Sequence, residues 1–384
     1  MNHMLLRPTT RRSGITLLEV LISIFVLAFG LLGVAALIPV GRFAIVEVGK
    51  ADRSAVCGRA GLHEIKIRQF PDVNDGTLRP MTDIRTWRDH SGTEVLSSAD
   101  TAAQRLAKRR LAYAIDPLFV AQNSNACEYF PYIVTNASPA VIRSAAMRRV
   151  TFSQYDTFGK LQQIEQPLAE RIFMLQDQVL FDVPDDRDQR PRELRLLHTG
   201  VVEPRPFLLG DDSDGLGNDL LTEVRGDYTW LATVVPVLSN GNPTGTYTVS
   251  IVVFYKRDFT HDALAIKPSE RFVDAELLGG GDVKLKVSNG PSVPNPKDPP
   301  QLDVRRNEWL LLSSDIPAGG TFRWYRVVAI DDEAEEESSG NWVRYATLAG
   351  PDWPANEAGT DVYATLIDGV VGVYTTTIDL GDQK

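Results

Sequence analysis

The sequence has few of the residues that catalysis and metal binding most often use. Its 384 residues include five histidines and two cysteines. No His-Glu-x-x-His, Cys-x-x-Cys, Gly-x-Ser-x-Gly or Gly-x-x-x-x-Gly-Lys pattern occurs. The common signatures of metalloproteases, thiol oxidoreductases, serine hydrolases and P-loop nucleotide hydrolases are therefore missing. A triad assembled from distant residues would leave no such signature, but nothing in the sequence favours one, and we predict that the protein is not an enzyme.

The sequence also lacks a basic excess and low-complexity tracts. The formal net charge is −10, and removing the first fourteen residues with their three arginines makes it −13, from 37 basic and 50 acidic residues. Such a chain is not attracted to nucleic acid by bulk electrostatics, so no nucleic-acid partner is expected. Cys57 and Cys127 could form one disulfide outside the cytoplasm or remain two buried thiols, and the sequence leaves both open.

One long apolar run is present near the N-terminus. From Ile15 to Val40 there are 26 residues, and Glu19 is the only charged one. As a helix this run would be about 39 Å long, enough to cross a hydrocarbon core of about 30 Å. An unpaired carboxylate in lipid costs about 2.5–3.5 kcal/mol on insertion scales. Glu19 therefore needs a positive partner, or the segment must leave the membrane for a protein assembly.

The residues before the run indicate how it is processed. Three arginines and no acidic residue precede Glu19, so we expect the N-terminus to be cytoplasmic and the rest of the chain to lie outside. A secretory signal carries its small residue after the apolar region, whereas Gly14 lies before it. Cleavage after Gly14 would remove the leader, keep the helix and create a free α-amino group on Ile15. That amine could neutralise the Glu19 carboxylate of a neighbouring copy.

The sequence Gly-Ile-Thr-Leu-Leu-Glu-Val at residues 14–20, with the apolar residues after it, resembles the N-terminal signal of type IV prepilins and type II secretion pseudopilins. Its continuation, Phe-Gly-Leu-Leu-Gly at residues 29–33, is most similar to the PilV group of minor pilins and its pseudopilin relatives. The resemblance implies cleavage after Gly14 by prepilin peptidase, N-methylation of Ile15 and pairing of Glu19 with the amine of an adjacent subunit.

The function that this resemblance implies is structural. The protein would be a minor pilin or pseudopilin that assembles with other pilin or pseudopilin subunits into a type IV pilus or a type II secretion pseudopilus, or primes it. It would lie in the inner membrane with one transmembrane helix, a cytoplasmic N-terminus and a periplasmic globular domain. The alternative is a single-pass, membrane-anchored extracytoplasmic binding protein that does not polymerise, with Glu19 near the membrane interface.

Four segments are expected: the leader at 1–14, the transmembrane part of the helix at 15–40, its extracytoplasmic half at 41–70, and a globular domain at 71–384. Pro39 is expected to kink the helix or remove a hydrogen bond near the membrane exit. The extracytoplasmic half should press a stripe of small residues onto the globular domain. The predicted stripe consists of Ala44, Val48, Ala51, Ala55, Leu62 and Ile65.

The globular domain is expected to hold short helices first and then strands, from about residue 228. The helices are predicted at residues 101–114, 138–149 and 166–181. β-Branched and aromatic residues predict strands at 228–237, 246–256, 282–287, 308–313, 321–330, 342–348 and 362–373. The turn signals between them favour an antiparallel sheet. The predicted fold class is α+β, with a long, pilin-like N-terminal transmembrane helix packed on a large antiparallel β-sheet domain with short helices.

One stretch is a candidate metal site. Four carboxylates lie close together among glycines, and such a loop could supply oxygen ligands to Ca²⁺. They are Asp211, Asp212, Asp214 and Asp219. The spacing does not match an EF-hand loop, and acidic, glycine-rich turns are usually only solvated. No other cofactor is expected.

Overall fold

The computed structural model describes most of the chain and divides it into two compact units, Met1–Asp52 and Arg53–Lys384. The described residues are 17–68, 87–95, 99–123, 128–132, 145–155, 161–164, 166–175, 179–181, 222–224, 227–239, 241–259, 267–288, 300–314, 320–337, 341–354 and 361–379.

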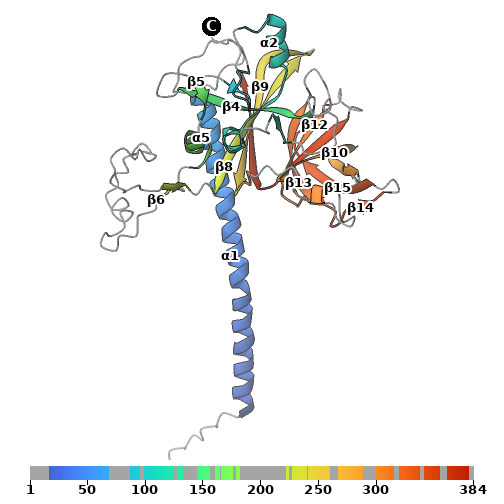
Figure 1. The fold of residues 1–384 in the computed structure, drawn as a ribbon. Helices are drawn as coiled ribbons and strands as arrows, with labels where there is room; N and C mark the ends of the chain where they lie inside the picture. The colour runs from blue at the N-terminus through green and yellow to red at the C-terminus, as the bar shows by residue number, and fades with distance from the viewer. Residues whose placement is uncertain are drawn as a thin grey trace, which may run out of the picture. The chain divides into compact units, whose positions relative to one another are not determined.

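The long N-terminal helix predicted from the sequence is present. Helix α1 runs from Leu17 to Arg68, and its turns from Arg53 onward belong to the second unit. Pro39 lies inside the helix without ending it. Because proline has no N–H group, one intrahelical hydrogen bond is necessarily missing there. Figure 1 shows α1 as a single continuous element.

The first sheet of the second unit is built around two long strands. Strands β8 (Tyr228–Ser239) and β9 (Asn242–Tyr255) form a hairpin, and β17 (Val370–Asp379) adds antiparallel to β9. On the other side of β8 lie β2 (Tyr113–Ile115), β4 (Met147–Tyr155) and β1 (Trp87–Arg88). Two short strands, β3 (Tyr129–Phe130) and β5 (Leu161–Gln163), also pair with β4. The pair β2–β4 is parallel, so this sheet is mixed rather than purely antiparallel as predicted.

The second sheet closes on itself. It contains β10 (Glu270–Gly279), β11 (Asp282–Ser288), β12 (Trp309–Ser314), β13 (Phe322–Ile330), β15 (Asn341–Ala349) and β16 (Val362–Ile367). The order β11-β10-β16-β12-β13-β15 is completed by pairing of β15 with β11, so these six strands form a closed antiparallel barrel. The short β14 (Glu335–Glu336) pairs with β15. A separate pair is formed by β6 (Val179–Phe181) and β7 (Thr222–Val224).

Several predicted elements need correction. The strand predicted at 362–373 is two strands, because the turn at Asp368 and Gly369, with Gly369 at φ +82°, sends β16 into the barrel and β17 into the first sheet. Of the helix predicted at 101–114, only α2 (Ala102–Arg109) forms, capped by Thr101 with Gln104 in a capping box. Residues 113–114, 147–149 and 179–181, which were predicted as helix, are parts of strands because they pair with neighbouring strands.

Two further short helices accompany the first sheet. Helix α3 (Pro117–Gln122) was not predicted, and α5 (Gln166–Phe173) is the first half of the helix predicted at 166–181. A 3₁₀ turn, η3 (Pro300–Leu302), lies beside the barrel strands β10 and β11.

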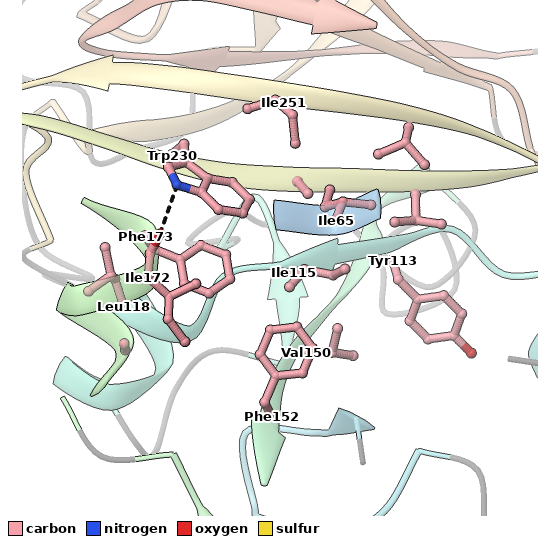
Figure 2. Packing of buried hydrophobic residues seen from close by; sticks show 14 of the residues in the cluster. Ile65, Tyr113, Ile115, Leu118, Val150, Phe152, Ile172, Phe173, Trp230 and Ile251 are labelled. Carbon is pink, nitrogen blue, oxygen red and sulfur yellow. Dashed lines mark hydrogen bonds between the residues drawn. The ribbon is translucent and has the colours of Figure 1, made fainter. Parts of the chain in front are cut away.

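The hydrophobic core has a layer on each face of the first sheet. On one face, Trp230 and Ile251 pack with Ile65 of α1 and with Phe173 of α5, and Trp230 Nε1 donates to the carbonyl of Ile172 at 3.1 Å (Figure 2). On the other face, residues of the sheet pack against outward-facing residues of the barrel. This layer includes Leu231, Val252, Phe254, Leu311, Phe322 and Trp324. The sheet is therefore covered on both sides, by helices on one and by the barrel on the other (Figure 1).

Candidate processing and assembly site

Glu19 lies in the first turn of α1, and its side chain is exposed. A carboxylate at this position interacts favourably with the partial positive charge at a helix N-terminus. The Ser23 hydroxyl donates to the backbone carbonyl of Glu19 at 2.7 Å, which leaves the carboxylate out of that contact. Gly14 and Ile15, the predicted cleavage and methylation residues, lie outside the described residues.

The helix around Glu19 presents an exposed apolar surface along its described residues. Its most apolar 18-residue window has a mean hydropathy of 2.8, and none of that window is buried. Leu21, Phe25 and Leu32 are more than half exposed, at 57%, 62% and 68%. By length and composition this helix can cross a membrane. A surface of this kind needs lipid or other apolar helices around it.

The C-terminal turns of α1 are seated on the first sheet, and both partners belong to the second unit. The buried positions follow the spacing of one helix face. They are Ser54, Cys57, Gly58, Gly61 and Ile65. This set of buried residues differs from the stripe predicted from the sequence. Of the predicted residues, the structure leaves Ala44, Val48 and Ala51 exposed and fully buries only Ile65.

Two glycines of α1 allow the helix to approach the first sheet closely. A Cβ atom on Gly58 would lie 2.1 Å from Cδ2 of Tyr374 on β17, and one on Gly61 would lie 2.9 Å from Cγ2 of Ile251 on β9. Across the same contact, the hydroxyls of Ser54 and Tyr374 are 3.2 Å apart. The prediction included Ile65 and the half-buried Ala55 and Leu62 but missed the two glycines. Hydrophobicity patterns count alanine, valine and leucine, whereas the contact depends on the absence of side chains.

A second group of residues that the sequence did not reveal is a buried cluster of four charges. Asp116 follows β2, Arg149 lies on β4, Arg257 follows β9, and Glu270 begins β10 of the barrel. Their side chains are between 0% and 2% exposed. We call these four residues the buried charge cluster. With two positive and two negative side chains, it is formally neutral.

Each charge in the buried charge cluster has an opposite partner. Arg257 binds both oxygens of Asp116, at 2.8 Å and 2.6 Å. Arg149 bridges the two acids, donating to Asp116 Oδ2 at 2.9 Å and to Glu270 Oε2 at 2.5 Å. Glu270 also accepts from Arg257, at 3.2 Å, and from the backbone N–H of Tyr132, at 2.9 Å. The cluster therefore connects the first sheet to the barrel through charge-assisted hydrogen bonds.

These contacts shift the ionisation of two members. Burial by itself would raise the pKa of Asp116, but the adjacent Arg257 and Arg149 outweigh it and hold that pKa below its usual value. Burial likewise would lower the pKa of Arg257, but Asp116 and Glu270 raise it. Phe119 stacks against Arg149, with the guanidinium carbon 3.9 Å from the ring centroid. The four charged side chains are buried, and their hydrogen bonds join the first sheet to the barrel.

The remaining site predictions concern a calcium loop and the two cysteines. In the described ranges, no group of three or more His, Cys, Asp or Glu side chains could hold a metal ion. The predicted calcium loop, with Asp211, Asp212, Asp214 and Asp219, lies outside those ranges. Cys57 is buried against the sheet, and Cys127 lies outside the described residues. A disulfide between them and two separate thiols both stay predictions.

Comparison with known proteins identifies the N-terminal segment. Residues 9–35 match the family model of the prokaryotic N-terminal methylation motif. This motif is the signature of type IV pilins and pseudopilins, so the chain carries a pilin-type N-terminus, as the sequence predicted. No curated protein and no solved structure shows a significant match to this chain. The motif and the apolar helix agree with membrane anchoring.

Proposed function

We propose that this protein is a structural subunit of a pilin-type assembly, a minor pilin or pseudopilin that enters or primes a type IV pilus or a type II secretion pseudopilus. The observation that carries the proposal is the methylation motif at residues 9–35, with Glu19 as the only charge in the apolar run that follows it. A role in assembly explains that charge, whereas a plain anchor gains nothing from it.

Each residue of the motif has a separate task in this proposal. Prepilin peptidase cuts after Gly14, and Ile15 then becomes the methylated N-terminal residue. The Glu19 carboxylate pairs with the Ile15 amine of an adjacent subunit. The pair removes the cost of about 2.5–3.5 kcal/mol that an unpaired carboxylate meets in lipid. Assembly is thereby favoured over the isolated subunit in the membrane.

The remainder of the chain fits a role outside the membrane. In the proposed arrangement the leader at 1–14 is cytoplasmic, residues 15–40 cross the inner membrane, and residues 41–70 and 71–384 are periplasmic. Residues 53–384 form a separate compact unit, and its size supports a minor rather than a major subunit. The proposed role is structural rather than catalytic, and calcium binding by the loop at residues 211–219 is a further proposal.

The experiment is a charge substitution with a matched control in the same helix. Glu19→Gln keeps the size of the side chain and removes the charge, so we expect normal membrane insertion but loss of the protein from sheared filaments or pseudopili. Glu47→Gln removes another exposed carboxylate of α1, one that binds Lys50 at 3.2 Å, and should leave assembly unchanged. Equal incorporation of both variants would refute the proposed charge pairing. Absence of the wild-type protein itself from filaments and pseudopili would favour the membrane-anchored binding protein that does not polymerise.

A further inference from the structure

The buried arginines of the second unit differ in what balances their charge. Among the described residues, Arg149, Arg257, Arg271 and Arg344 are each at most 8% exposed. The first two bind the acids of the buried charge cluster, and Arg271 binds Asp368 at 2.9 Å. Arg344 forms no ion pair with any described residue. Because a buried charge without a counter-charge is costly, Arg344 calls for an anion from elsewhere.

The hydrogen bonds of Arg344 all go to neutral acceptors. Nε donates to the carbonyl of Asp331 at 2.9 Å, Nη1 to that of Leu302 at 2.9 Å, and Nη2 to that of Asp332 at 3.2 Å. These three bonds hold η3 and the turn after β13 against β15, but they bring no negative charge to the guanidinium. A guanidinium has five N–H donors, so two remain for a further acceptor.

Arg344 lies at the mouth of the barrel and lines a pocket. Side chains alternate along a strand, and Trp342 and Ala346 of β15 both belong to the core of the barrel, so Arg344 between them also points inward. The pocket that it lines has a volume of about 570 Å³. Small-molecule sites are commonly about 300–1,000 Å³ in volume and often lie at barrel mouths.

The charges around this pocket favour a single negative charge in its occupant. Arg305 and Arg306 also line it, both are exposed, and neither forms an ion pair with a described residue. Asp331 and Asp332 line it too, so three arginines and two aspartates give a formal charge of +1. A doubly charged phosphate would be repelled by the two aspartates, whereas a carboxylate balances the charge and matches the fork of a guanidinium.

The remaining walls of the pocket are apolar. Val304, Val328, Ala329 and Ile330 line it beside the arginines. The pairing of β13 with β15 shifts register around Val328, and this β-bulge leaves the Val328 side chain exposed at the pocket. These side chains can cover the hydrocarbon part of a ligand whose charged end meets Arg344.

We propose that the pocket at the barrel mouth binds a small organic acid with one carboxylate. Arg344 supplies the buried charge, Arg305 and Arg306 add charge at the rim, and Val328 and Ile330 contact the apolar part of the ligand. The proposal rests on the second unit alone and is independent of the pilin-type function, so the failure of either leaves the other standing.

The first test is calorimetric titration of the full chain in detergent with butanoate, and with butanamide as the uncharged control of the same shape. Butanoate should bind about tenfold more tightly, because hydrogen bonds to an ionised group are about twice as strong as those to a neutral one. Equal affinity for the two compounds, or no binding of butanoate, would overturn the proposal.

The second test substitutes the arginines. Arg306→Gln should weaken butanoate binding about two- to fivefold and leave butanamide unaffected. Arg344→Lys keeps the charge but loses the planar fork, so a loss of about tenfold is expected. Arg148→Gln is the control, because it changes the net charge equally at an exposed residue that lies on β4 and pairs with Glu128. An equal loss in Arg148→Gln and Arg306→Gln would refute a specific site.

The third measurement identifies the source of the carboxylate. The acidic turn at residues 331–337 of a second copy could also reach these arginines, so light scattering is recorded on the same samples. A monomer that binds butanoate supports the small acid, whereas a dimer that Arg306→Gln dissociates would overturn it in favour of the second copy. If near-ultraviolet circular dichroism shows that Arg344→Lys does not fold, Arg306→Gln and the comparison of butanoate with butanamide decide.

Discussion

A substitution at Gly58 tests the close contact between α1 and the first sheet. A Cβ on Gly58 would lie 2.1 Å, 2.4 Å and 2.7 Å from three ring carbons of Tyr374. The ring cannot simply turn aside, because its hydroxyl lies 3.2 Å from that of Ser54 and its edge lies against Gly372. Gly58→Ala should therefore force the helix or the ring to move.

The size of the effect is the difference between two opposing terms. Overpacking of a well-filled contact costs about 1–3 kcal/mol. Replacing glycine by alanine in a helix gains about 0.5–1 kcal/mol. The net loss in the free energy of unfolding is therefore up to about 2.5 kcal/mol, and the loss relative to a control that makes only the gain is about 1–3 kcal/mol. Gly49→Ala is the matched control, because nothing lies within 4 Å of a Cβ at that position and only the gain applies.

The assay is thermal unfolding of the full chain in detergent, followed by near-ultraviolet circular dichroism of the sheet's aromatic residues. Gly58→Ala should lower the midpoint by a few degrees, and Gly49→Ala should leave it unchanged or raise it slightly. Adding Tyr374→Ala to Gly58→Ala should cost less than the sum of the single changes, because the clash is then gone. A Gly58→Ala protein as stable as the Gly49→Ala control would refute the seating of α1 described above.

Three further predictions concern the interior of the second unit. Asp116→Asn should lower the free energy of unfolding by about 3–5 kcal/mol in chemical denaturation, because it leaves Arg257 and Arg149 buried without that partner. The folded-state pKa of Asp116 is lower than its unfolded value of about 3.9, so the stabilisation that Asp116 contributes is fully present above that pH. The stabilisation is lost as the pH falls through the folded-state pKa. Acid unfolding should therefore start below about pH 4, and its pH dependence should be less steep in Asp116→Asn. Trp230→Phe should lower the free energy of unfolding by about 1 kcal/mol or somewhat more in chemical denaturation, because it removes the 3.1 Å hydrogen bond to the Ile172 carbonyl. An unchanged value in any of these three measurements would contradict the corresponding contact.

The N-terminal features could be predicted because they are written along the chain. An apolar run, one charge within it and a glycine before it are local patterns, and both the family match and α1 agree with them. Eight of the seventeen described strands of the second unit lie in predicted segments, since alternation of apolar and polar residues is a local property, whereas the long strands β4 and β10 were missed. The β8–β9 hairpin is an example, with Gly241 at φ +73° in the turn between the strands.

What the sequence did not reveal depends on residues far apart in the chain. The barrel closes only because β11 pairs with β15, and no local pattern specifies that pairing. The buried charge cluster likewise joins Asp116, Arg149, Arg257 and Glu270 from four separate segments. In the sequence, each of these charged residues looks like an ordinary surface residue. Only the packing of the sheet against the barrel brings the four side chains together and buries them.

The measurement that tests the central claim most directly is the mass of the N-terminal peptide of the protein isolated from a cell with an active prepilin peptidase. We predict a chain that begins at Ile15 and carries one methyl group on its α-amino nitrogen. A chain that keeps residues 1–14 in such a cell would have no amine for Glu19 to pair with. That result would contradict the pilin-type function and leave a membrane-anchored protein of another kind.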